Sequence, residues 1–214
     1  YTGVNTFIEM SWGLPRNLII ILNEIFEKAI FNDEKPFIEE NRISIESQNS
    51  GVLVASKWFE DNSNIGGESG SLMTNSLIKL VTLLKDVRFS DKPSECSVSS
   101  FCVNIEKISK KTQETLKLMA QHSLIVSFRF RKNKNKDKVY RAFQVNRMLA
   151  PLWELPISRR GVLQFNEDLA NSIFDENHSE YYEFQKNILL SQLKPPFGSK
   201  IKKSDYSQLT IPGL

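Results

Sequence analysis

Apolar residues recur at helical spacing along much of the chain. From residue 15 to 31, leucine, isoleucine and alanine return every three or four positions, which predicts a helix buried on most sides. The segments 44–59 and 71–89 repeat this spacing and predict two more helices. Ser109 is placed to cap a further helix, whose inner face would carry Thr112, Leu116, Met119 and Ala120. The first half of the chain is therefore expected to be mostly helical.

Strand-like alternation of apolar and polar residues appears later and is confined to short stretches. Residues 124–131 and 139–145 alternate and predict two strands joined by a lysine-rich hairpin, and residues 101–105 fit a short strand or, nearly as well, a short helix. After residue 146 the pattern predicts a short strand at 162–165, a helix capped by Asn166 and a last helix at 181–193. The fold class predicted is mainly α with a small β component.

The residues from Asp61 to Gly70 divide the chain, because they are rich in asparagine, serine and glycine. With a boundary near Gly67, we expect a helical region at 1–66, a second domain at 67–146, and an appended helical segment with a tail at 147–214. In the second domain a helix, a short strand, a capped helix and a charged hairpin follow one another. This order is typical of a winged helix-turn-helix domain.

Composition excludes several classes of function. The 214 residues carry a net charge of +3, no apolar run reaches about 18 residues, and the start shows no basic leader. We therefore expect a cytoplasmic protein with no membrane partner. Cys96 and Cys102 fit no disulfide or zinc pattern, and His122 and His178 lie far apart in sequence. No metal and no catalytic acid or base are assigned.

Positive charge is concentrated between residues 129 and 141. In a winged helix the first turn of the helix before the hairpin enters the major groove while the hairpin contacts the backbone. The sequence thus predicts weakly specific binding of double-stranded DNA. The alternatives are a noncatalytic protein-interaction or oligomerisation module, or a transcription regulator. The predicted contacts are Lys110, Lys111, Thr112 and Gln113 in the helix, and Arg131, Lys132, Lys134, Lys136 and Lys138 in the hairpin.

A resemblance to a known family rests on the start of the first predicted helix. Gly13-Leu14-Pro15-Arg16-Asn17-Leu18 heads that helix, and Ile43-Ser44-Ile45-Glu46 heads the next. With the winged-helix order that follows, residues 10–146 resemble the lid and winged-helix region of AAA+ ATPases of the origin-recognition and Cdc6-like group. The segment after residue 146 is similar to elements appended to bacterial multidomain ATPases.

The resemblance implies a role for Arg16. It would be the sensor arginine that reaches the γ-phosphate of ATP bound to a preceding nucleotide-binding domain. Leu14 and Pro15 stand where the family usually has a small and an acidic residue, and no Walker A or Walker B segment is present. We therefore expect no ATP hydrolysis by these residues alone, no cofactor in this chain, and ATP with Mg²⁺ in the full-length protein. The implied partners are the preceding ATPase domain and a further copy of the protein.

Overall fold

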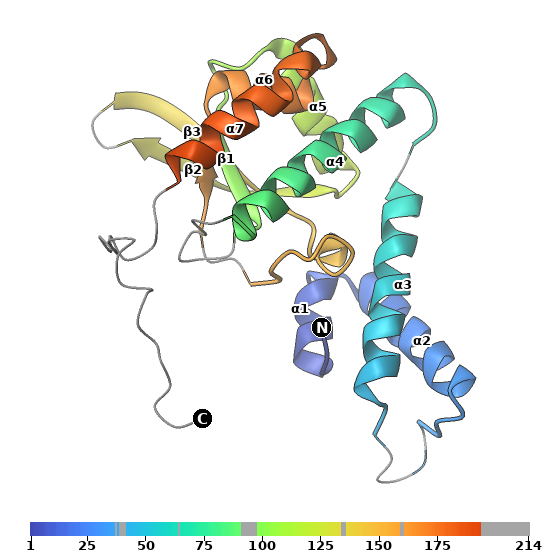
Figure 1. Cartoon of the computed structure of the whole chain (residues 1–214). Coiled ribbons are helices and arrows are strands. Elements are labelled where there is room, and N and C mark those ends of the chain that lie inside the picture. Colours follow the sequence, from blue (N-terminus) through green and yellow to red (C-terminus); the bar gives the residue numbers. More distant parts are fainter. Residues whose placement is uncertain are drawn as a thin grey trace, which may run out of the picture.

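The computed structural model describes residues 1–36, 38, 42–63, 65–90, 98–133, 136–158 and 161–193, and for 129–133 and 136–139 it describes the backbone alone. Within these ranges it has seven α-helices, two short 3-10 helices and one four-stranded sheet (Figure 1). The predicted mainly α fold with a small β component is confirmed. No helix in the described ranges is both long and apolar enough to cross a membrane.

Three helices form the N-terminal part: α1 (Val4–Ser11), α2 (Pro15–Phe31) and α3 (Ile45–Ser63). The sequence analysis did not predict α1. Trp12 and Gly13 have φ of 54° and 72°, so two left-handed residues reverse the chain between α1 and α2. α2 and α3 pack closely because Gly51 faces Ile25, whose Cα would lie only 2.5 Å from a Cβ at position 51. That approach fixes where the first turn of α2 lies.

The second part begins with α4 (Glu68–Arg88) and continues with β1 (Ser100–Asn104), α5 (Lys110–Gln121), β2 (Ile125–Asn133) and β3 (Lys136–Val145). The sheet order is β2-β3-β1-β4, in which β1 is antiparallel to β3 and parallel to the short β4 (Leu163–Gln164). The register of β2 against β3 shifts between Ser127 and Arg129, which marks a bulge. The elements of the predicted second domain therefore occur in the predicted order.

An aromatic cluster forms the centre of the core beside β1. The Phe101 ring stacks on Phe143, Phe165 and Phe174, with centroids 5.5, 4.8 and 5.7 Å away. Phe174 ends α6 (Glu167–Phe174), which is followed by η2 (Glu176–Tyr181) and α7 (Tyr182–Gln192). Since Phe101 and Phe174 are both fully buried, α6 is part of the core of the sheet domain.

α6 and η2 are joined to α4 by polar contacts as well. Lys79 on α4 donates to the Ser172 carbonyl at 3.0 Å and to Ser179 Oγ at 2.6 Å, and Tyr182 donates to the Lys79 carbonyl at 2.7 Å. Burial lowers the pKa of Lys79. These contacts fix the segment that follows the hairpin against the helix that precedes it.

A comparison with the helix-turn-helix motif shows one difference. A helix-turn-helix has two consecutive helices before the hairpin, whereas here α5 alone lies between β1 and β2. Both α4 and α6 pack beside α5, and α6 comes from beyond the hairpin. The segment predicted as an appendage thus supplies a helix that the predicted winged helix needs.

The N-terminal helices and the sheet domain meet around η1 (Arg147–Leu149) and the turn after it, which lies between them in Figure 1. The Arg147 guanidinium lies 4.8 Å from the Trp12 ring centroid, and Tyr1 donates to the Leu155 carbonyl at 2.6 Å. A single hydrophobic cluster includes residues on both sides of the predicted boundary near Gly67. The division into three domains stays a prediction.

Candidate nucleic-acid interface and the arginine of α2

A groove of about 670 Å³ runs between α5 and the strands β2 and β3. Its helical wall is the exposed ridge of α5, on which Lys110, Glu114, Lys117 and Gln121 follow one another at helical spacing. Lys110 and Lys117 form no ion pair with any described residue. The remaining lining residues are Ile105, Gln113, Leu116, Ala120, Ser127, Arg141 and Phe143.

The sheet wall of the groove holds a third cation, Arg141 on β3. Its Nε donates to Ser127 Oγ at 3.0 Å, and its guanidinium lies 5.8 Å from the centroid of the Phe143 ring. Among the described residues that line the groove, three are cations, Lys110, Lys117 and Arg141, and one is a carboxylate, Glu114. A groove with this balance favours polyanions.

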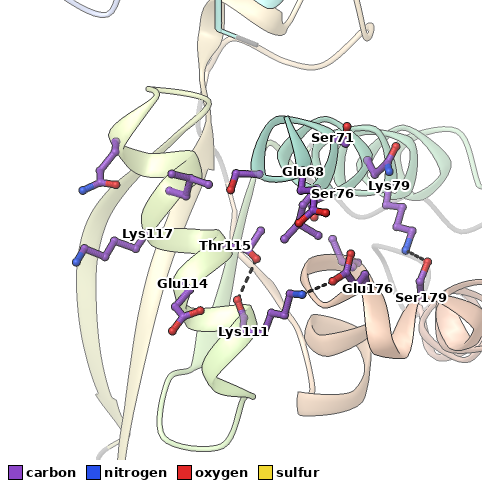
Figure 2. A pocket seen from close by; sticks show the side chains of 16 residues that line it. Glu68, Ser71, Ser76, Lys79, Lys111, Glu114, Thr115, Lys117, Glu176 and Ser179 are labelled. Atoms are coloured by element: carbon purple, nitrogen blue, oxygen red, sulfur yellow. Dashed lines mark hydrogen bonds and ion pairs between the residues drawn. The ribbon is translucent and has the colours of Figure 1, made fainter. Parts of the chain in front are cut away.

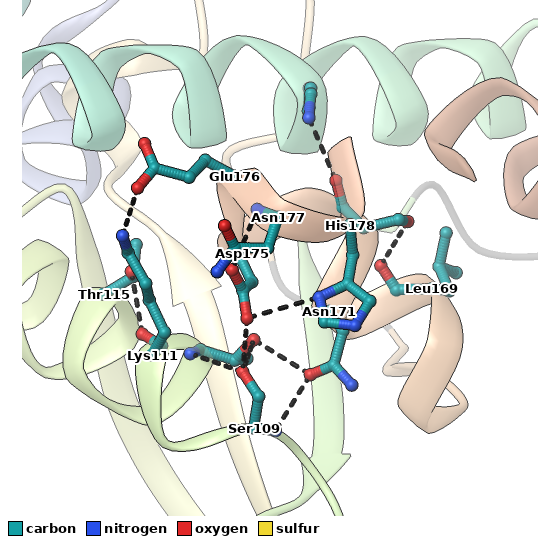
Figure 3. Close-up of polar contacts among 12 residues, drawn as sticks. Ser109, Lys111, Thr115, Leu169, Asn171, Asp175, Glu176, Asn177 and His178 are labelled. Atoms are coloured by element: carbon teal, nitrogen blue, oxygen red, sulfur yellow. Dashed lines mark hydrogen bonds and ion pairs between the residues drawn. The ribbon is translucent and has the colours of Figure 1, made fainter. Parts of the chain in front are cut away.

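One side of the first turn of α5 faces α6 and η2 rather than this groove (Figure 3). Ser109, the N-cap, accepts a hydrogen bond from the Thr112 N–H at 3.0 Å and donates to Asp175 Oδ2 at 2.8 Å. Thr112 is fully buried and donates from Oγ1 to Asn171 Oδ1 at 2.9 Å. Asn171 lies in α6, and Asp175 is the C-cap of that helix. The C-terminal segment, by which we mean α6 and η2, therefore covers this end of α5.

The neighbours of Thr112 are also engaged. Lys111 forms an ion pair and hydrogen bond with Glu176, and this bond is the main reason that the pKa of Lys111 is raised. Gln113 donates from Nε2 to the carbonyls of Ile105 and Ile108, at 3.0 and 3.2 Å. Of the four residues predicted in the first turn, the structure places Lys110 and Gln113 at the groove and Lys111 and Thr112 against the C-terminal segment.

Asp175 is the buried acid of this cluster. Burial is the largest influence and would raise its pKa, but it is outweighed by hydrogen bonds from Ser109 and the Asn177 N–H, together with nearby His178. The pKa of Asp175 is therefore lowered. A buried carboxylate that stays ionised adds negative potential at the end of α5 where the sequence predicted DNA phosphate.

For the predicted hairpin contacts other than Lys134, the structure describes the backbone only. β2 and β3 place the backbone of Arg131, Lys132, Lys136 and Lys138 on the hairpin that was predicted to carry them. The side chains of these residues are not described, and Lys134 lies outside the described residues altogether. DNA contact by this set stays a prediction.

Sequence reasoning left Lys117 and Arg141 out of the predicted set. Lys117 was recognisable, because it lies seven residues after Lys110 and therefore on the same face of α5. Arg141 was not, since the bulge in β2 sets which side chain of β2 lies beside it, and strand register is not readable from one sequence.

Arg16 is exposed in the first turn of α2, directly after Pro15. Its guanidinium lies 5.3 Å from the centroid of the Trp58 ring on α3, and it forms no ion pair with any described residue. Leu14, the N-cap of α2, makes no side-chain hydrogen bond to the first turn. An uncapped helix start beside an arginine is favourable for an anion.

A second hollow of about 710 Å³ lies on the other side of the α5 ridge, between α4, α5 and η2 (Figure 2). Three lysines and three glutamates line it, so it has no charge preference for an anion. Ser76 Oγ is buried at its wall without a hydrogen-bond partner in the described part of the chain. No group of three or more potential metal ligands occurs among the described residues.

Comparison with known proteins gives one match. The family model described as ORC-CDC6-like matches residues 1–165, about three quarters of the chain, and the chain belongs to this family. The match confirms the resemblance seen at the head of α2, and it includes Arg16, α5 and the whole hairpin. No curated protein and no solved structure matches the chain. The helices α6 and η2, which close the first turn of α5, lie beyond the matched residues.

Proposed function

We propose that this chain is the C-terminal part of an AAA+-type ATPase and engages duplex DNA through the groove between α5 and the β2–β3 hairpin. The observation that carries the proposal is the cluster of Lys110, Lys117 and Arg141 in one groove with a single carboxylate. The groove lies between a helix and the hairpin that follows it, where a winged helix meets nucleic acid.

The expected binding is weak and dependent on salt. Three phosphates neutralised by Lys110, Lys117 and Arg141 correspond to a slope of roughly −2.7 for log affinity against log salt. The lysines and arginine predicted in the hairpin would steepen that slope. Because these contacts go to phosphates, they position the protein on DNA without reading sequence.

Arg16 supplies the proposed connection to nucleotide. Family membership associates the chain with ATPases, and Arg16 stands exposed at the uncapped start of α2. Exposed apolar side chains on the same helix, among them Ile19 at 65% and Phe31 at 82% exposure, would be covered by the preceding nucleotide-binding domain. In that arrangement the state of the bound nucleotide changes how α2 is held, and α2 meets the DNA-binding part through α1, α3 and η1.

The same apolar surface also favours the alternative, a protein-interaction or oligomerisation module. Ile45 on α3 is 67% exposed, and Leu53 and Val54 are exposed on the same helix. A partner protein or a second copy of this chain would bury these side chains. In this alternative the groove beside α5 would have no affinity for DNA.

Fluorescence anisotropy with a labelled duplex across a salt series tests the proposal. The variant Lys110→Gln/Lys117→Gln removes two groove charges, and the matched control Lys28→Gln/Lys57→Gln removes one charge from α2 and one from α3. We expect the groove variant to reduce the slope by about 2 and the control to leave it unchanged. Equal slopes in both variants, or no salt-dependent binding by the wild type, would reject the groove as a DNA-binding site.

The predicted hairpin contacts form a third arm of this experiment. Lys132, Lys134 and Lys136 are changed together to glutamate in the otherwise natural chain. We expect affinity for duplex DNA to be lost at moderate salt, since the change replaces three attractive charges with three repulsive ones. Undiminished affinity in this variant would remove the hairpin from the interface.

A further inference from the structure

We infer that this protein holds duplex DNA along the exposed flank of α5, without reading base sequence, because the C-terminal segment closes the first turn of that helix. This inference rests on the proposed DNA binding and specifies which part of α5 makes contact. It also assigns a function to α6 and η2: they set the mode of binding.

The N-terminal end of α5 is covered by carboxylates, which would repel a phosphate. Asp175 is buried against Ser109, and Glu176 pairs with Lys111, so two carboxylates stand beside the positive end of the helix (Figure 3). A helix start attracts phosphate because its free N–H groups and dipole favour an anion. Here the Ser109 hydroxyl accepts the hydrogen bond of the Thr112 N–H, so this N–H is not available to a phosphate. The negative charge of the buried Asp175 carboxylate would also repel a second anion.

The side chains that would read bases from this end are also occupied. Base recognition in the major groove needs hydrogen-bonding side chains that reach the base edges. Thr112 is fully buried and bonded to Asn171, and the Gln113 amide nitrogen donates hydrogen bonds to two backbone carbonyls. Insertion of this turn into the major groove would require breaking these contacts and displacing α6 from the core that Phe174 shares with Phe101.

The flank of α5 that lines the groove is exposed to solvent, unlike the N-terminal end that α6 and η2 cover. Lys110, Glu114, Lys117 and Gln121 lie on one exposed ridge that spans about 16 Å along the helix axis, with two cations and one carboxylate. Arg141 faces this ridge across the groove, so cations stand on both walls. A row of cations along a helix follows a DNA backbone and contacts phosphates, which are the same for every sequence.

Two lysines of the same helix provide a matched test. Lys117→Gln removes a charge from the open flank, and Lys111→Gln removes one from the closed end, so net charge changes equally. Anisotropy is measured over a salt series with three duplexes of equal length and unrelated sequence. We expect Lys117→Gln to weaken binding several-fold to all three and to lower the salt slope by about 1, while Lys111→Gln changes affinity less than about twofold.

The outcomes separate this inference from the function on which it rests. Salt-dependent binding with affinities within about threefold across the three duplexes, lost preferentially in Lys117→Gln, supports both. Binding that Lys111→Gln weakens as much as Lys117→Gln, or that differs more than about tenfold among the duplexes, overturns the flank inference and keeps DNA binding. Absence of binding by the wild type overturns DNA binding itself.

Discussion

Gly51→Ala is the substitution whose effect the structure defines most sharply, because α2 and α3 touch through backbone at that residue. A Cβ at position 51 would lie 2.5 Å from Ile25 Cα, 2.6 Å from Ile25 N and 2.8 Å from the Glu24 carbonyl carbon. Ordinary contact begins at 3.4 Å, and backbone atoms cannot turn aside as a flexible side chain can. Relief of the clash therefore requires α2 to move away from α3 by about 1 Å.

The magnitude follows from two opposing effects. Overpacking of this kind lowers the free energy of unfolding by about 1–3 kcal/mol. We expect a value near the upper end, about 3 kcal/mol, because the three atoms nearest to the new Cβ all belong to the backbone. Replacing glycine by alanine inside a helix returns about 0.5–1 kcal/mol through the backbone entropy of the unfolded chain. The net loss in free energy of unfolding is about 2 kcal/mol, which corresponds to a fall in Tm of roughly 4–8 °C for a chain of this size.

Thermal unfolding followed by circular dichroism measures this effect. Asn23→Ala, at an exposed position of α2, is the control that improves helix propensity without a clash, and we expect it to leave Tm unchanged or to raise it slightly. If Gly51→Ala raised Tm as Asn23→Ala does, the close contact of α2 with α3 would be wrong. The position of Arg16 at the start of α2 would then lose its support.

Four further predictions concern the site and its supports. Since the pKa of Asp175 is lowered in the folded protein, its ionised carboxylate stabilises the fold above the ordinary aspartate pKa, and this stabilisation is lost as pH falls below it. The free energy of unfolding in urea should therefore differ less between pH 7 and pH 3 for Asp175→Asn than for the wild type. Phe174→Ala should cost about 3–5 kcal/mol in urea unfolding, and a loss below about 1 kcal/mol would exclude α6 from the core. Glu114→Gln removes the one carboxylate among the described residues that line the groove, and it should tighten duplex binding at low salt about twofold or more, with weaker binding as the contrary result. Arg16→Ala should change the free energy of unfolding by less than about 1 kcal/mol, so a larger loss in urea unfolding would make Arg16 a structural residue.

Local signals in the sequence were sufficient for the helices and strands whose ends carry a cap or a proline. Pro15 starts α2, and Ser109 and Asn166 cap α5 and α6 with the hydrogen bonds that the sequence predicted. α1 was missed because it is short, and its N-cap Gly3 makes no side-chain hydrogen bond. Eight residues are too few for helical periodicity to stand out from chance.

The site was less predictable, because its geometry depends on contacts distant in sequence. Thr112 was predicted both to face the core and to contact DNA, and the structure places it in the core, bonded to Asn171. No local pattern connects residue 112 with residue 171, since the pairing follows from where α6 packs. The Lys111–Glu176 ion pair escaped prediction for the same reason. The groove beside Lys117 and Arg141 required the register of β2 on β3, which a bulge shifts.

Amide chemical shifts of the ¹⁵N-labelled chain, recorded while duplex DNA is added at low salt, show where the protein contacts DNA. We expect shift changes along the exposed ridge of α5 from Lys110 to Gln121 and on β2 and β3, with little change at Asn171 to Glu176 or on α2. Changes centred on α1–α3, or on α6 and η2 with the α5 ridge unaffected, would contradict the claim that this groove holds DNA.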